Sequence, residues 1–206
     1  MLKRCKNLVK RIYAGMGEKA YSVKLAFRGT EGVPSAEPVK DPEKTVWLFL
    51  LEKIGNAYAA AGLMGNFYAE SGLRANALEN SFKTRQGMTD ESYTIAVDSL
   101  AYKDFVKDNA GYGIAQWTFR SRKQKLLNYA RKQGKSIGDL HMQLDFFWKE
   151  LTDDYPDVLV SLERAKSVRE ASDEVLMRYE MPEDKSETMM QRRAGYGQGY
   201  YDKYTI

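Results

Sequence analysis

The sequence predicts a mainly α-helical domain over residues 43–206 and a separate segment over residues 1–42. In the domain, apolar residues recur three and four positions apart, which is the spacing of one buried face of an α-helix. Just before it, residues 29–42 read GTEGVPSAEPVKDP, and this concentration of Gly, Pro and Ser is typical of a linker. The first segment also differs in charge, because its nine Lys/Arg and four Asp/Glu give it a net charge of +5, whereas the whole chain carries +4.

The first two helices of the domain have clear boundaries. Asp41-Pro42 is a typical helix start, because Asp accepts backbone hydrogen bonds and proline suits the first turn. Gly55 ends this helix, after apolar residues at helical spacing: Trp47, Leu50, Leu51 and Ile54. Asn56 then caps AYAAAGLMGNFYAES. Small residues four apart in this second helix predict the close approach of another helix, and they are Ala61, Gly65 and Ala69.

The remaining elements are less regular. Residues 76–110 are predicted to be a loop with one short helix, and GYGIAQW at 111–117 is typical of a turn or small hairpin. Further helices are predicted over 122–133, from a capping box at 136–139 to Leu151, from a second capping box at 167–170 to Pro182, and over 186–203. In the first segment, Val23, Leu25 and Phe27 alternate with polar residues, as in a short strand.

Composition excludes several classes of protein. No run of about 18 apolar residues predicts a membrane span, and MLKRCKNLVKRIYAG lacks the apolar core of a secretory signal. Cys5 is the only cysteine and His141 the only histidine, so we expect no internal disulfide, no metal site and no cofactor. The basic segment 1–42 suits contact with a polyanion, and a solvated surface without a partner is the alternative.

Glu70 is a candidate general acid from its position alone. It falls near the C-terminal end of an apolar predicted helix, on the same face as Leu63, Asn66 and Phe67. The partial negative charge of a helix C-terminus and an apolar wall both disfavour an ionised carboxylate. A carboxyl group that stays protonated near neutral pH can donate a proton in catalysis. The alternative is an ordinary ion pair with a nearby arginine such as Arg74.

Several motifs in a fixed order carry a resemblance to a known family. NAYAAAGLMGNFYAESGLRANALE at 56–79, followed by GYGIAQW at 111–117, closely resembles the phage tail-type lysozyme family. That family looks like a branch of the lysozyme, goose-type lysozyme and lytic transglycosylase superfamily. The similarity continues through LLNYARKQGKS, QLDFFWKEL and RYEMP and covers about residues 46–206. It implies a lysozyme-like helical domain with a small hairpin or loop region at the cleft.

The resemblance also implies roles for particular residues. Glu70, in the Glu-Ser-Gly step, takes the place of the catalytic acid, and the stretch that ends in Gln116 lines the sugar cleft. Ser71 belongs to the same step and is expected to bind substrate. Tyr179 falls in a late motif similar to one in lytic transglycosylases, although Met181-Pro182 departs from that motif.

Residue chemistry agrees with a sugar cleft at GYGIAQW. Gly111 and Gly113 would let the backbone approach a sugar ring without a side chain in the way. Tyr112 and Trp117 offer faces on which pyranose rings can stack, and core packing is the alternative for Trp117. Gln116 can donate and accept hydrogen bonds with an N-acetyl group or a hydroxyl group.

A second carboxylate is harder to choose. Glycosidases usually use two carboxyl groups, and Glu79 is the candidate closest in sequence within the matching stretch. The following loop offers further acids, namely Asp90, Glu91, Asp98, Asp104 and Asp108. An enzyme of this superfamily that manages with Glu70 alone is the alternative.

The expected function is therefore cleavage of the β-1,4 bond between N-acetylmuramic acid and N-acetylglucosamine in peptidoglycan. Segment 1–42 is an expected contact for anionic wall polymers. A protein without a secretory signal would be made in the cytoplasm and released by phage lysis, as an endolysin, or carried in a virion. The alternatives are a lytic transglycosylase and a non-catalytic wall-binding or phage structural module. A nucleic-acid-binding role is disfavoured, because residues 43–206 are close to neutral and contain no basic recognition helix.

Overall fold

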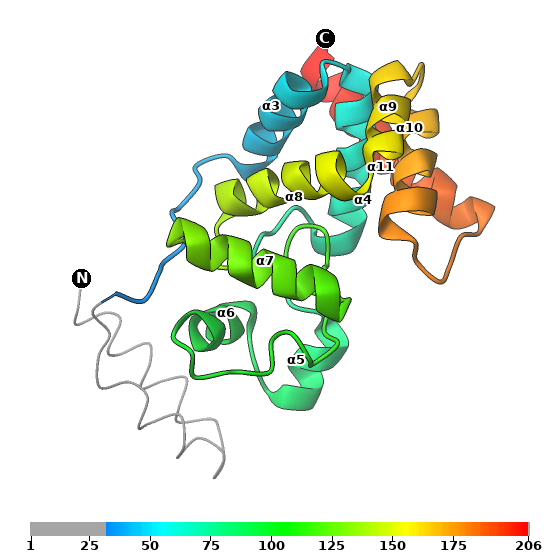
Figure 1. Ribbon diagram of the computed structural model, residues 1–206. Helices are drawn as coiled ribbons and strands as arrows, with labels where there is room; N and C mark the ends of the chain where they lie inside the picture. The colour runs from blue at the N-terminus through cyan, green and yellow to red at the C-terminus, as the bar shows by residue number, and fades with distance from the viewer. Residues whose placement is uncertain (1–31, 206) are drawn as a thin grey trace.

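The computed structural model describes residues 32–205, and this part of the chain is mainly α-helical, as predicted. The predicted strand at Val23–Phe27 lies outside the described residues. Figure 1 shows the order of the elements, which are α3 (Pro42–Ile54), α4 (Ala57–Ser71), α5 (Asn80–Gln86), α6 (Asp90–Asp98), α7 (Arg120–Gln133), α8 (Leu140–Asp154), α9 (Pro156–Arg164), α10 (Val168–Val175), the π-helical turn η1 (Leu176–Glu180) and α11 (Glu187–Thr205).

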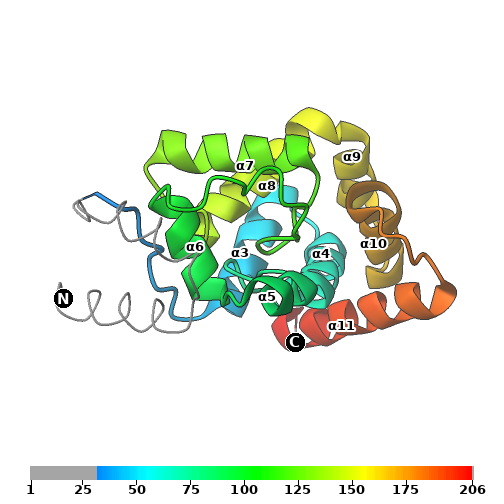
Figure 2. The ribbon, with the colours of Figure 1, turned by 90° about the horizontal axis from the view of Figure 1, so that it is seen from below.

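Helix α4 is the centre of the core. Helices α3, α9, α10 and α11 all pack against it, and its residues from Ala59 to Phe67 are buried. Helix α8 contacts α3, α7 and α9 and closes the core on another side. Helices α6 and α10 lie at opposite sides of the molecule in both views (Figures 1 and 2). Helix α4 is buried from Ala59 to Phe67, and its C-terminal end, which carries Glu70, reaches solvent.

The predicted stripe of small residues on α4 does admit another helix. A Cβ atom on Gly65 would lie 2.6 Å from the backbone nitrogen of Gly197 in α11, and a Cβ on Gly197 would lie 2.7 Å from the carbonyl oxygen of Ala61. Real Cβ contacts are never this short, so both glycines are needed for α4 and α11 to approach this closely. The contact also brings Arg193, one turn before Gly197, to the end of α4.

Most helix boundaries agree with the sequence prediction. Asp41 Oδ1 accepts a hydrogen bond from the Lys44 N–H at 3.0 Å, and Asn56 Oδ1 accepts one from the Tyr58 N–H at 2.9 Å. Gly55 ends α3 with a φ of 73°, a left-handed conformation that favours glycine. Each cap satisfies a backbone group that the helix itself leaves without a partner.

Several details of the prediction were wrong. Residues 76–110 contain two helices, α5 and α6, because Thr89 and Ser92 form a capping box that starts α6. Helix α8 is capped by Asp139 rather than by Ser136, whose hydroxyl hydrogen-bonds to Asp98 instead. The helix that was predicted to run from Ser167 to Pro182 is α-helical only as far as Val175, and the π-helical turn η1 follows it.

The last residues of the predicted linker contact the domain. The Glu37 N–H donates to Asp139 Oδ2 at 3.2 Å, and the Lys135 ammonium lies 2.7 Å from Glu37 Oε1. Val39 packs against the core, and α3 begins at Pro42. Among the residues that the structure describes, no helix has the length and apolarity to cross a membrane.

Candidate active site

An open groove runs past the C-terminal end of α4. It consists of two hollows of about 340 and 450 Å³, and both are lined by Glu70, Glu79 and Gln116. The first hollow extends towards Phe119 and Glu180, and the second extends along Ser71–Arg74 and Leu78–Ser81. These volumes lie within the range of ordinary ligand sites. The three shared residues therefore mark the middle of the groove, with space for a ligand on both sides.

Glu70 is held by an ion pair with Arg193. The Arg193 Nη2 atom donates to Glu70 Oε1 at 2.6 Å, and the Arg193 side chain is only 6% exposed, whereas that of Glu70 is 21% exposed. Arg74, the partner considered in the sequence prediction, pairs instead with Asp90. The prediction that Glu70 lies against an apolar wall is therefore wrong in one respect, because the buried guanidinium group of Arg193 contacts its carboxylate. Glu70 remains accessible from the groove.

Arg193 is fixed from behind by a polar network inside the core. Its Nη1 donates to Asn66 Oδ1 at 3.2 Å, one helical turn before Glu70. The Asn66 amide in turn donates to the carbonyl oxygens of Gly62 and Ser172 at 2.9 and 3.1 Å. The network links α4, α10 and α11, so the direction of the Glu70 carboxylate is set by the packing of three helices.

Glu79 is positioned by the backbone of the GYGIAQW segment. Its N–H donates to the Gly111 carbonyl oxygen at 2.9 Å, and its Oε2 accepts from the Gly111 N–H at 3.1 Å. The other carboxylate oxygen, Oε1, accepts a hydrogen bond from Ser81. A carboxylate with these donors is held in one orientation at the groove.

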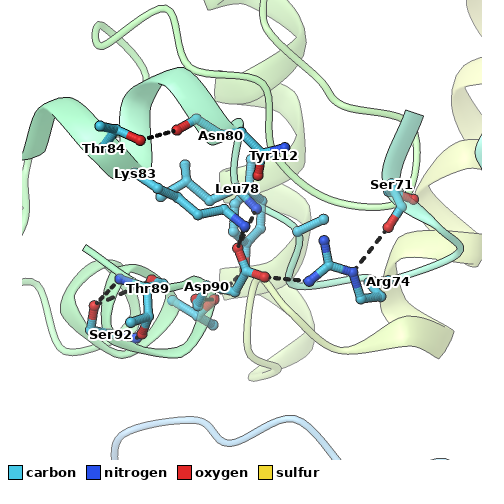
Figure 3. A network of polar contacts seen from close by, with 12 residues as sticks. Ser71, Arg74, Leu78, Asn80, Lys83, Thr84, Thr89, Asp90, Ser92 and Tyr112 are labelled. Carbon is cyan, nitrogen blue, oxygen red and sulfur yellow. Dashed lines mark hydrogen bonds and ion pairs between the residues drawn. The ribbon is translucent and has the colours of Figure 1, made fainter. Parts of the chain in front are cut away.

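Asp90 holds the chain that connects the two glutamates. The Asp90 carboxylate accepts the Leu78 N–H at 2.9 Å and contacts Lys83 and Arg74, and Figure 3 shows these contacts. Arg74 also donates from Nε to the Ser71 carbonyl oxygen at 3.1 Å. Burial raises the pKa of Asp90, but the hydrogen bonds and charges of these neighbours outweigh burial and lower it. Asp90 is therefore ionised and structural.

The GYGIAQW segment forms a tight turn, as predicted, with an isolated bridge between Tyr112 and Trp117. Gly113 does not face a sugar site, because a Cβ at this position would lie 2.7 Å from the buried side chain of Gln143. The Gln143 Oε1 accepts the Ile114 N–H at 2.9 Å and so holds the turn. Ser71, which is buried, donates its hydroxyl to the turn at the Ile114 carbonyl oxygen, 2.9 Å away. Gln143 and Ser71 thus hold the turn that borders the groove.

Gln116 lies at the groove, and the nitrogen of its side-chain amide is already hydrogen-bonded within the protein. Its Nε2 donates to the carbonyl oxygens of Ala77 and Gly113 at 2.9 and 3.0 Å. A Cβ on Gly111 would lie 2.8 Å from Gln116 Oε1, so the glycine makes room for this side chain. The amide oxygen is therefore what Gln116 can offer a ligand, as an acceptor.

The aromatic residues expected to contact sugar are buried. Tyr112, Trp117 and Tyr179 are each 0% exposed, so stacking a pyranose ring on them is excluded. Trp117 Nε1 and the Tyr179 hydroxyl donate to Glu150 Oε2 at 3.0 and 2.7 Å, and these rings pack the core. The sequence could not show this, because an amphipathic aromatic suits either place.

Exposed side chains at the rim of the first hollow were missed in the sequence. Phe119 and Met181 are 61% and 45% exposed, and both line this hollow. Each lies close to a motif residue in the sequence: Phe119 is two positions after Trp117, and Met181 is two positions after Tyr179. Their apolar surface is available to the faces of sugar rings.

Two charged residues of the first hollow were also missed. Glu180 and Arg122 line it beside Glu70 and Glu79. Burial raises the pKa of Glu180 to about 8, and the charge of Glu70 adds to this, while Arg122 and Arg193 oppose it. The motif RYEMP contains Glu180, so the sequence did indicate this region, but the expected role was assigned to the preceding residue, Tyr179.

The acids of the loop between the motifs do not line the groove. Asp98 binds Ser136 and the Ile137 N–H, and Asp108 pairs with the buried Lys123. In residues 32–205, no group of three or more His, Cys, Asp and Glu side chains is arranged to hold a metal ion. Of the sequence candidates for a second carboxylate, only Glu79 lies beside Glu70 in the hollows described.

A helical domain whose open groove presents a cluster of carboxyl groups is suited to acid–base cleavage of a polymeric chain such as a glycan. The model of the phage tail lysozyme family matches residues 41–204, and the chain belongs to this family. Family membership implies peptidoglycan as the substrate and action on the bacterial cell wall. No curated protein and no solved structure is similar enough to the chain to match it.

Proposed function

We propose that this protein hydrolyses the β-1,4 bond between N-acetylmuramic acid and N-acetylglucosamine, with Glu70 as general acid. The observation that carries the proposal is the position of Glu70 in the middle of a groove, reachable by a ligand and fixed by a buried arginine. A glycan strand could extend into both hollows and place one of its bonds at Glu70. General acid catalysis requires this proximity to the leaving oxygen.

In the proposed reaction, Glu70 gives its proton to the glycosidic oxygen as the bond to the anomeric carbon breaks. The carboxylate that results is stabilised by Arg193, whose Nη2 already lies 2.6 Å from Oε1. This stabilisation increases as charge develops, so it favours the transition state over the ground state. Arg193 is therefore a positioning residue that supports proton donation.

Glu79 is the proposed base. Its carboxylate, oriented by the Gly111 N–H and Ser81, would accept a proton from the water that attacks the anomeric carbon. Gln116 would accept a hydrogen bond from an N-acetyl N–H or a hydroxyl group through Oε1. Phe119 and Met181 would pack against sugar faces at the rim.

The products of digestion test this proposal. Purified peptidoglycan is digested with the wild-type protein, and the soluble muropeptides are reduced with borohydride and weighed. Hydrolysis at the proposed bond leaves reducing N-acetylmuramic acid ends. Products lighter by one water, which resist reduction, would show lytic transglycosylation and remove the role of Glu79. Reducing N-acetylglucosamine ends would show that the other bond is cut, and absence of any product would favour a binding module.

A further inference from the structure

Glu180 occupies a position in the groove that the proposed reaction does not yet use. It is the last residue of η1, and Met181 after it has a φ of 49°, so the chain turns sharply at this point. Tyr179 before it is buried and bonded to Glu150. Tyr179 thus anchors the turn, and Glu180 lines the same hollow as Glu70. Single π-helical turns occur frequently at functional sites.

One oxygen of the Glu180 carboxyl group is buried without a partner. Glu180 Oε1 accepts no hydrogen bond in the structure, although the residue lies within a cluster of charged groups. An ionised carboxylate with a buried, unsatisfied oxygen is costly, and such a group avoids the cost by keeping its proton. The raised pKa of Glu180, which burial causes first and the charge of Glu70 second, agrees with this.

The charges around Glu180 do not balance if every carboxyl group is ionised. The charges that act on Glu180 belong to Glu70 of α4, Arg122 of α7, Glu150 of α8 and Arg193 of α11, and Glu70 and Arg122 line the same hollow as Glu180. Glu150 takes up the charge of Arg122, because Arg122 Nε and Nη2 bind its two oxygens at 2.7 Å each. Only Arg193 is left to balance Glu70 and Glu180. Two guanidinium groups therefore face three carboxyl groups, and one proton restores the balance.

We propose that Glu180 is a positioning residue that shares a single proton with Glu70, so that the pair carries one negative charge and Glu70 can be supplied with the proton it donates. This inference rests on the proposed function of Glu70. The ion pair with Arg193 does not itself supply a proton, and a shared proton provides the one that a general acid must donate. Two interacting carboxyl groups release their protons in steps that belong to the pair.

The test is the pH profile of Glu180→Gln. Initial rates of peptidoglycan solubilisation are measured from pH 4 to pH 10 for the wild type, for Glu180→Gln and for the control Glu163→Gln. The control removes the same charge from an exposed position on α9. Glu180→Gln removes the second carboxyl group of the pair and with it the shared proton. The alkaline limb of the Glu180→Gln profile is expected to move down by about one pH unit or more, which is about a tenfold loss of rate on that limb.

The outcomes separate this inference from the proposed function. A Glu180→Gln profile that has the same alkaline limb as the wild type overturns the inference and leaves Glu70 untouched. The carboxyl signals of protein labelled with ¹³C-glutamate provide a second measurement that does not depend on activity. A glutamate signal that titrates near pH 8, and is lost in Glu180→Gln or displaced in Glu70→Gln, supports the shared proton. If all glutamate signals titrate below pH 6, the inference is wrong even if Glu70→Gln is inactive.

Discussion

The loss of stability expected on substitution of Glu150 can be estimated from its hydrogen bonds. Its side chain is 1% exposed, and its carboxylate accepts four hydrogen bonds of 2.7–3.0 Å, two from Arg122 and one each from Trp117 and Tyr179. Burial raises the pKa of Glu150, but Arg122, Trp117 and Tyr179 together lower it overall. The group is thus ionised and stabilises the fold above about pH 4.5, and this contribution is lost as the pH falls.

The substitution Glu150→Gln removes the charge and keeps the shape. The amide oxygen can replace Oε2, which accepts from Trp117 and Tyr179, so these two bonds are retained. The amide NH₂ then faces Arg122 Nε, where a donor meets a donor, and the buried guanidinium group loses its counter-charge. Removing one partner of a buried pair typically costs about 3–5 kcal/mol, and the retained bonds place this substitution near about 3 kcal/mol. For a chain of this size the melting temperature would fall by about 6–12 °C.

The assay is urea unfolding followed by tryptophan fluorescence, at pH 7 and at pH 3.5. Asp154→Asn is the matched control, because Asp154 forms an exposed pair with Lys125 and should lose less than about 1 kcal/mol. The difference between wild type and Glu150→Gln should shrink at pH 3.5, because the contribution of a lowered pKa is progressively lost as the pH falls below about 4.5. A loss below about 1 kcal/mol at pH 7 would refute the assignment of Glu150 as the centre of this network.

Three further outcomes are expected. Gly65→Ala should lower the free energy of unfolding by about 1–3 kcal/mol in urea titrations, because its Cβ would meet the Gly197 backbone; an unchanged midpoint would contradict the packing. Burial raises the pKa of Asp98 to about 6, so stability should fall as the pH rises from about 4 to 6, and Asp98→Asn should remove this fall in melting curves. Phe119→Ala should raise KM for soluble glycan fragments severalfold with kcat unchanged, and an unchanged KM would exclude the rim contact.

The helices could be predicted because local signals decide them. Asp41, Asn56 and Gly55 act at the ends of α3 and α4 as their residue types suggest, and the small residues around Gly65 mark where α11 approaches. The short helices α5 and α6 were underestimated, since a helix of seven or nine residues carries little periodic pattern. Helix α9 was not predicted, although Pro156 starts it.

The sequence could predict only those site residues that lie within one motif. Glu79 follows Glu70 by nine residues within one motif, so the presence of both at the groove could be predicted from that motif. Arg193 lies 123 positions after Glu70, and no local pattern indicates that α11 returns to the end of α4. Burial was the other difficulty. Tyr112 and Trp117 are motif residues with suitable chemistry for a sugar, but they fill the core, and only the packed structure distinguishes the two roles.

Glu70→Gln is the most direct test of the account. The amide can still accept the hydrogen bond from Arg193, so the protein should stay folded, although its melting temperature should fall because Arg193 loses a counter-charge. The amide cannot donate a proton to a glycosidic oxygen. Release of soluble muropeptides from purified peptidoglycan, measured as an initial rate by chromatography and mass spectrometry, should fall by about 10²–10⁴-fold. A folded Glu70→Gln protein that releases muropeptides at close to the wild-type rate would contradict the account.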